Sequence, residues 1–133
     1  SHPEVGYNFR MPNLLAAFGV AQLENIEEYV RIKRQNAELY NSLLREVSGI
    51  TLPAEKEWAN NVNWLYSVVI EEEFGIDRDE LIRELKENEI EARPFFLPVH
   101  VMEPYSDAKR GDLGVTDELY KRGINLPSSV GIK

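Results

Sequence analysis

A helical pattern that runs from Pro12 to Val47 constrains this chain more than any other part of its sequence. Proline suits the first turn of a helix, because its missing N–H is not needed there. Apolar residues then recur at spacings of three and four, which indicates an amphipathic helix. The pattern predicts either one long helix or two helices with a break near Asn25, and Gly49 is a natural stop. The apolar positions are Leu14, Leu15, Phe18, Ile26, Tyr29, Val30, Ile32, Leu39, Leu43 and Val47.

Two further segments carry a helix signal. Asp77 is followed by Glu80 three residues later, which is the signature of a helix N-terminus. The helix that begins there is predicted to place its apolar residues on one face. A shorter helix is predicted over residues 112–122, and Gly123 ends its pattern.

Four short segments are predicted to be strands, because they contain β-branched or aromatic residues, and three of them also contain a proline. Pro94 interrupts one of them, which suits an edge strand or a strand end. This order of elements predicts an α+β fold, with a small and mostly antiparallel sheet, helices on one face and a long N-terminal helix. The predicted strands span residues 49–53, 64–71, 90–96 and 124–129.

The composition excludes several classes of protein. The 133 residues suffice for one domain with a core, and 43% of them are hydrophobic, which excludes a disordered chain. The formal net charge of −8 argues against nucleic-acid binding, which needs a basic surface. No apolar run reaches the ~20 residues of a membrane-spanning helix. The absence of cysteine is compatible with a reducing cytoplasm, and the two histidines, His2 and His100, match no metal-binding spacing.

The stretch Gly6–Met11, "GYNFRM", places an amide, a guanidinium and two aromatic rings directly before a helix N-terminus. Such a terminus presents free N–H groups and a positive potential, which favour a phosphate. The amide of Asn8 and the guanidinium of Arg10 would add donors to the same anion. The alternative interpretation is structural, with Asn8 in a turn and Arg10 capping a carbonyl group.

A second stretch, "EARPFFLPVHVMEPY", sets Arg93, His100 and Tyr105 among prolines and apolar residues. Prolines hold a loop in a fixed shape, which suits the wall of a binding site. A purely structural turn is the alternative interpretation of the same residues.

Three segments together resemble a known family. The segment from "GYNFRM" through the small-residue helix ending in "AQL" to the following "KR" and tyrosine resembles the sugar aminotransferases of the DegT/DnrJ/EryC1/StrS family. "RPFFLPVH" with a tyrosine after it, and "RGINLPSS", resemble two later segments of the same family. The matches occur in the family's order and extend over nearly the whole chain.

The resemblance implies an enzyme that uses pyridoxal 5′-phosphate (PLP), has the aspartate-aminotransferase fold and forms a homodimer. Such enzymes move an amino group, commonly from glutamate, to the keto group of a nucleotide-linked sugar for cell-surface polysaccharide, lipopolysaccharide or antibiotic sugars. The chain would be the C-terminal portion, truncated at both ends, with residues 1–30 an interface segment and residues 31–133 the small domain. The Schiff-base lysine would lie upstream, so the isolated chain is expected to be inactive.

Residue by residue, Asn8 matches the family asparagine that reaches the cofactor phosphate of the other subunit, and Arg10 matches the arginine of the same motif. Arg93 and His100 match positions on the substrate side of the cleft, and Tyr105 matches the tyrosine that follows them. Two other interpretations stay open: a non-catalytic α+β binding or interaction domain, and a PLP-dependent sugar dehydratase of the same family.

Overall fold

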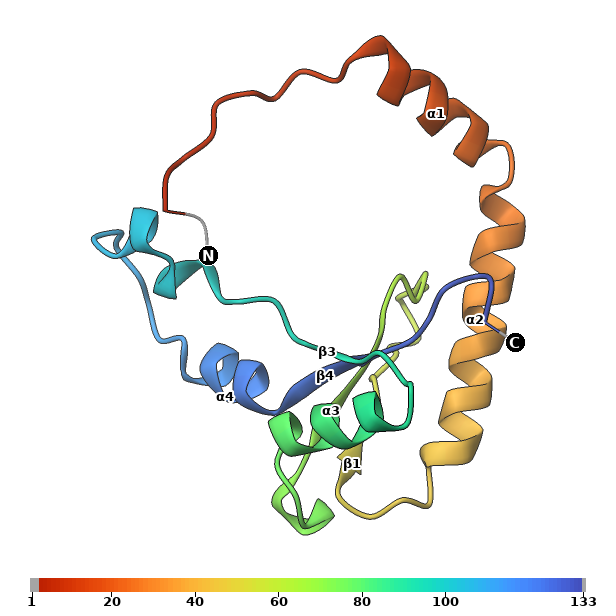
Figure 1. Ribbon diagram of the computed structural model, residues 1–133, viewed down its shortest axis with the longest axis vertical. Coiled ribbons are helices and arrows are strands. Elements are labelled where there is room, and N and C mark those ends of the chain that lie inside the picture. Colours follow the sequence, from red (N-terminus) through yellow and green to blue (C-terminus); the bar gives the residue numbers. More distant parts are fainter. Residues whose placement is uncertain (1–2, 133) are drawn as a thin grey trace.

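Over residues 3–132, the computed structural model shows a four-stranded antiparallel sheet with helices packed against it and an N-terminal segment that arches away (Figure 1). The α-helices are α1 (Asn13–Leu23), α2 (Ile26–Leu44), α3 (Arg78–Glu87) and α4 (Gly114–Arg122). The strands are β1 (Ile50–Thr51), β2 (Tyr66–Ile70), β3 (Arg93–Pro94) and β4 (Gly123–Leu126). Short 3₁₀ helices are η1 (Glu72–Phe74), η2 (Val99–Val101) and η3 (Glu103–Tyr105).

The long helical pattern forms two helices, and the break lies at Asn25, one of the two predicted alternatives. Asn25 adopts φ −113° and ψ 8°, outside the helical region. Its side-chain Nδ2 donates a hydrogen bond to the carbonyl of Ala21 at 3.2 Å. Such a bond competes with regular helix geometry, because it offers the backbone an alternative partner. α1 therefore ends just before Asn25, and α2 starts in a new direction directly after it (Figure 1).

The turn between α2 and β1 depends on Gly49. This residue has a φ of +78°, and a Cβ atom at its position would collide with the backbone of Phe74. Only glycine combines this left-handed conformation with so close an approach. α2 itself ends at Leu44, a little before the predicted stop.

The sheet has the strand order β1-β2-β4-β3, and each neighbouring pair is antiparallel. In the central pair, Val68 lies opposite Ile124 and Tyr66 lies opposite Leu126. Side chains alternate between the two faces of a strand, so these four lie on one face. β3 is an edge strand, which confirms the position predicted for Pro94, because an edge strand tolerates a residue without an N–H.

One face of the sheet forms the core together with α2 and α3. Tyr66, Val68 and Ile124 are the most buried side chains, each exposing 2% or less. The rings of Tyr40 and Tyr66 stack with their centroids 4.5 Å apart. Residues packed around this centre include Ala37 and Leu44 of α2, and Leu81, Ile82 and Leu85 of α3.

In the two N-terminal helices, the side chains that are buried are not the ones that the apolar pattern indicates. Leu39 and Leu43 belong to the predicted apolar stripe but are 59% and 66% exposed. The face of α2 that packs on the sheet instead includes Ala37 and Tyr40. In α1 no residue is buried at all, so its apolar residues form no stripe against the chain's own core. Local spacing alone therefore did not identify the buried face of α2. In α1 it indicated an apolar face, but none of the residues of this helix is buried.

The start of α3 confirms its predicted cap. The Asp77 carboxylate accepts a hydrogen bond from the backbone N–H of Glu80 at 2.8 Å, which satisfies one of the free donors of the first turn. Arg78, the next residue, is buried and donates to the carbonyl groups of Tyr120 at 2.8 Å and Gly123 at 3.3 Å. These bonds connect the start of α3 to the junction between α4 and β4.

Candidate functional site

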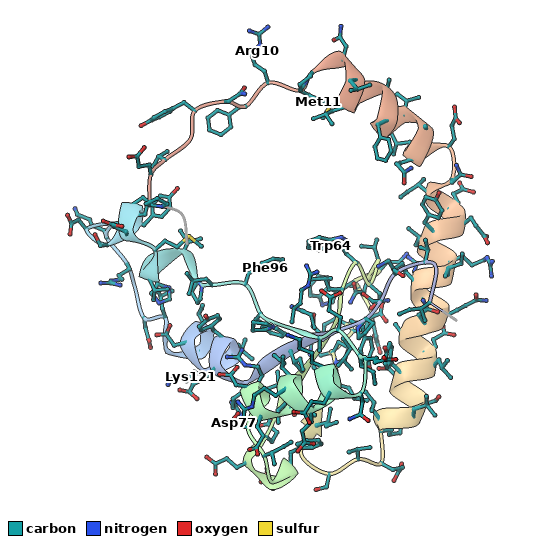
Figure 2. The ribbon with its side chains drawn as sticks, in the orientation of Figure 1. Arg10, Met11, Trp64, Asp77, Phe96 and Lys121 are labelled. Atoms are coloured by element: carbon teal, nitrogen blue, oxygen red, sulfur yellow. The ribbon has the colours of Figure 1, made fainter. Side chains whose placement is uncertain are left out.

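The N-terminal arm, residues 3–12, is extended and exposed along its whole length. Within it, the side-chain oxygen of Asn8 accepts a hydrogen bond from the backbone N–H of Arg10 at 3.3 Å. The Asn8 side-chain NH₂ group therefore stays available as a donor. The Arg10 side chain points outward from the arm, away from the sheet (Figure 2). Both residues are exposed, and neither is part of this chain's core.

The N-terminus of α1 follows directly and carries no capping side chain. Pro12 occupies the cap position with φ −63° and ψ 151°, and the first turn contains no acidic residue. The first-turn N–H groups of a helix have no partner within the helix, and they give this end a positive potential. Together with the side chains of Asn8 and Arg10, they form a set of donors suited to an anion.

The arm and α1 also expose a large number of apolar side chains, which we call the arm–α1 surface. Phe9, the most exposed of them, is 87% exposed. An apolar surface of this extent is typical of an interaction site, because water solvates it poorly. Its members are Tyr7, Phe9, Met11, Leu14, Leu15, Phe18, Val20 and Leu23.

Arg93 begins the edge strand β3 and is exposed. Its guanidinium pairs with Glu91, with Nη2 and Oε1 2.5 Å apart and both side chains about three-quarters exposed. The hydrogen bond from Arg93 holds the pKa of the Glu91 carboxyl below its ordinary value. An exposed pair of this kind contributes little to stability, so the guanidinium is free to exchange Glu91 for another anion.

His100 and Tyr105 lie together in the loop between β3 and α4. They line one pocket with Arg110 and other residues of the loop. The Nε2 atom of His100 is 2.9 Å from a carboxylate oxygen of Asp117 in α4. Arg110 donates to the backbone carbonyl of His100 at 3.3 Å. These contacts fix the imidazole ring against α4, and 15% of the His100 side chain stays exposed.

The structure thus brings two of the five predicted site residues together and leaves the others apart. His100 and Tyr105 share a pocket, while Arg93 lines a separate groove beside the end of the sheet. Asn8 and Arg10 belong to the arm, which precedes α1 and arches away from the sheet (Figure 1). The roles predicted for these residues stay predictions, because they concern partners and ligands beyond the chain itself.

Two features of this region were missed by sequence reasoning. The rings of Trp64 and Phe96 stack with centroids 6.2 Å apart and planes within 11°. The sequence indicates both residues only as parts of predicted strands. Asp117 was also missed as the partner of His100, because seventeen residues separate the two. The sequence indicates only that Asp117 is a carboxylate in the first turn of a predicted helix, which does not identify His100 as its partner.

Within residues 3–132, the structure contains no cluster of side chains suited to a metal ion. His2 lies outside these described residues. Over the same part of the chain, no helix combines the length and apolarity needed to cross a membrane.

Comparison with known proteins decides the family. The sequence matches the family described as "DegT/DnrJ/EryC1/StrS aminotransferase family" over residues 1–133. The chain belongs to this family. The resemblance inferred from its three motifs is therefore confirmed, and the family is one of PLP-dependent enzymes.

Individual relatives agree with this assignment. GDP-perosamine synthase of Vibrio cholerae is 40% identical over 98% of this chain and 36% of its own length. The protein named "Putative pyridoxal phosphate-dependent aminotransferase EpsN" of Bacillus subtilis is 34% identical over 96% of this chain and 33% of its own length. The chain therefore spans about a third of the length of these family members.

The fold also matches a solved structure of a sugar enzyme. The crystal structure of DesI in the presence of its TDP-sugar product superimposes with a TM-score of 0.82 at 28% identity, over 92% of this chain and 32% of DesI. The predicted α+β fold with a small antiparallel sheet is confirmed by this match and by the strand order. The DegT/DnrJ/EryC1/StrS chain described here corresponds to one part of that larger fold.

Proposed function

We propose that this chain is the C-terminal part of a PLP-dependent aminotransferase that transfers an amino group, from glutamate, to a keto nucleotide-sugar. The family assignment over residues 1–133 is the observation that carries the proposal. The name of the 40% identical relative, GDP-perosamine synthase, also points to an amino sugar linked to a nucleotide. The products would serve cell-surface polysaccharide, lipopolysaccharide or antibiotic-sugar biosynthesis in the cytoplasm.

The residues of the arm fit one part of the cofactor, its phosphate. A phosphate group is bound by convergent hydrogen-bond donors and by cations. The arm offers the Asn8 NH₂ group, the Arg10 guanidinium and the uncapped start of α1. PLP, when bound, supplies the electron sink for amino-group transfer. In our proposal, Asn8 and Arg10 hold its phosphate across a homodimer interface and take no part in proton transfer.

The arm–α1 surface supports the homodimer. Side chains such as Leu15 and Phe18 are exposed on α1, which has no buried residue. Burying them against a second subunit removes apolar area from water and would bring Asn8 next to the partner's cofactor. In this proposal the interface segment is residues 1–30, and α2, which begins at Ile26, continues across that boundary into the small domain.

On the substrate side, we propose that Arg93, His100 and Tyr105 contact the nucleotide-sugar. Arg93 is an exposed guanidinium with a replaceable partner, which suits a phosphate oxygen. His100 is fixed by Asp117. A neutral imidazole that donates its Nε2–H to Asp117 keeps Nδ1 as an acceptor for a substrate hydroxyl.

The proposal is tested by cofactor binding to the full-length protein that contains this segment. Asn8→Ala is expected to raise the dissociation constant of PLP about tenfold, because it removes a hydrogen bond to a charged group. Asn60→Ala is the matched control, since Asn60 is also exposed but lies in the loop before β2, and it should bind like the wild type. Equal PLP affinities of the Asn8 variant and the wild type would contradict the phosphate role.

The reaction class is tested separately. With PLP bound, the full-length protein should convert L-glutamate to 2-oxoglutarate and then aminate a keto nucleotide-sugar. A protein that binds PLP and removes a sugar hydroxyl, with no transfer of nitrogen from glutamate, would be a dehydratase of the same family instead. The isolated 133-residue chain should turn over no amino donor, because the Schiff-base lysine is expected upstream. Amino transfer by the isolated chain would refute that expectation.

A further inference from the structure

The aromatic pair of Trp64 and Phe96 is the feature that the site described above leaves unexplained. Trp64 precedes β2 and Phe96 follows β3, and their rings are stacked nearly parallel. Trp64 is 66% exposed and Phe96 is 72% exposed. Both labelled side chains lie on the side of the sheet toward the arm and α1 (Figure 2). Aromatic side chains are usually buried, because they have a large apolar area. An exposed pair with parallel rings therefore indicates a surface that binds a ligand.

The backbone on the Trp64 side of the pair is fixed by two basic residues of α2. Lys33 Nζ donates to the carbonyl of Trp64 at 2.7 Å, and Arg34 Nε donates to the carbonyl of Asn61 at 3.2 Å. Between these points, Asn63 adopts a left-handed φ of 49° and donates its N–H to the side chain of Asn61 at 2.8 Å. Asparagine tolerates this conformation, and the hydrogen bond to Asn61 stabilises it here. The loop therefore presents Trp64 in a defined orientation.

The Phe96 side is held by the sheet. Asn125 of β4 donates from its side chain to the carbonyl of Pro94 at 3.1 Å. The backbone N–H of Phe95 donates to the carbonyl of Gly123 at 3.2 Å. The ring of Phe95 lies so close over Gly123 that a Cβ atom there would collide with it. These contacts fix the chain just before Phe96, so both rings of the pair are carried by ordered backbone.

A groove lies beside the pair and adds charged groups to the flat apolar surface. It has a volume of about 500 Å³ and is lined by Trp64, Phe96, Arg93 and Lys33, among others. This volume lies within the range of small-molecule sites. Burial lowers the pKa of Lys33, whose ammonium group is already used to hold Trp64. Arg93 is thus the cation of the groove that can change partners.

We propose that the stacked pair is the platform for the base of the nucleotide-linked sugar, with Arg93 binding its diphosphate. This inference rests on the proposed function and adds the residues that hold the nucleotide. A nucleobase is a planar ring joined through a ribose to an anion, which matches two parallel ring faces beside an exchangeable guanidinium. The net charge of −8 would repel a diphosphate, so a cation beside the rings is needed.

The experiment measures calorimetric binding of three probes, UDP, GDP and dTDP, to the full-length protein. Trp64→Leu and Phe96→Leu should each weaken binding of the probe that binds best by about tenfold, because leucine keeps the apolar area but has no ring face. Trp64→Phe should restore binding to within about threefold, since a phenyl ring still stacks. Trp58→Leu is the control, because Trp58 is 87% exposed and lines none of the grooves near the pair.

A second probe separates base stacking from phosphate binding. Inorganic pyrophosphate should bind Trp64→Leu as it binds the wild type, whereas Arg93→Ala should weaken pyrophosphate and the nucleotides alike. Nucleotide affinity that is unchanged in Trp64→Leu would overturn the proposal. Equal loss of nucleotide and pyrophosphate binding in Trp64→Leu would also overturn it, because the pair would then support the fold or the rest of the protein. The proposed function fails by another readout, the inability of the wild type to bind PLP and accept an amino group from glutamate.

Discussion

α1 and α2 adjoin each other in the chain, separated only by Glu24 and Asn25, yet they differ in what they bury. α2 contributes Ala37, Tyr40 and Leu44 to the core beneath the sheet. α1 is more apolar in sequence, but none of its residues is buried. Hydrophobic composition therefore does not determine burial within one chain. α2 packs on the chain's own sheet, whereas α1 leaves its apolar side chains exposed for the interface proposed above.

The largest expected effect is on stability, and it tests whether the core lies under the sheet and not at α1. Ile124→Ala in the 133-residue chain should lower the free energy of unfolding by about 2–5 kcal/mol, because Ile124 is fully buried and its loss leaves a cavity. Leu14→Ala in α1 should change it by less than about 0.5 kcal/mol, since Leu14 is 80% exposed. Urea unfolding followed by tryptophan fluorescence measures both. A large loss at Leu14 would show that α1 packs on the core after all.

The second effect tests the interface proposed at α1. Phe18→Asp in the full-length protein should weaken dimerisation by about tenfold or more, because it places a charge in the proposed apolar contact. Val115→Asp is the matched control, since Val115 is similarly exposed but lies on α4. Sedimentation velocity over a range of protein concentrations measures the dissociation constant. The same dimer affinity in both variants would remove α1 from the interface.

A smaller effect concerns the start of α3, which packs on the core. Asp77→Ala should cost about 1 kcal/mol, because the N–H of Glu80 loses its acceptor. Asp77→Asn keeps a side-chain oxygen at the cap and should cost only a fraction of that amount. Thermal unfolding followed by circular dichroism ranks the three proteins. An alanine variant as stable as the wild type would show that the cap is unimportant here.

The smallest effect is a pH dependence that also arises from the core. Burial raises the pKa values of Tyr40 and Tyr66 above the ordinary tyrosine value. Above a pH of about 10 the unfolded chain would ionise these phenols while the folded chain keeps them protonated. Their contribution to stability is complete below that pH and decreases as the pH rises through the raised values. Urea unfolding between pH 9 and 11 should show this decrease, and Tyr66→Phe should reduce its slope.

Local sequence signals predicted the elements whose causes are local. The cap at Asp77, the edge position of Pro94 and the break near Asn25 each depend on one or two residues and on general backbone rules. Their outcome agrees with the structure. The side-chain donors of Asn8 and Arg10 lie two residues apart in the sequence, and their role in binding an anion stays a prediction.

Features that depend on distant residues could not be predicted in this way. Which face of α2 is buried depends on Tyr66, whose ring stacks on Tyr40 from another element. The pairing of His100 with Asp117 joins a loop to a helix that packs beside it. The leucine spacing in α2 indicated a face that is exposed in the structure. Periodicity shows that apolar residues share one side of a helix, but it does not show whether that side is buried.

The two outer strands of the sheet have a consequence for how copies of this chain can associate. β1 and β3 each contain two residues, and β3 includes Pro94, which has no N–H to offer. Strand addition at a sheet border needs a longer row of unpaired backbone groups. Ordered aggregation through cross-strand pairing is thereby disfavoured at both borders.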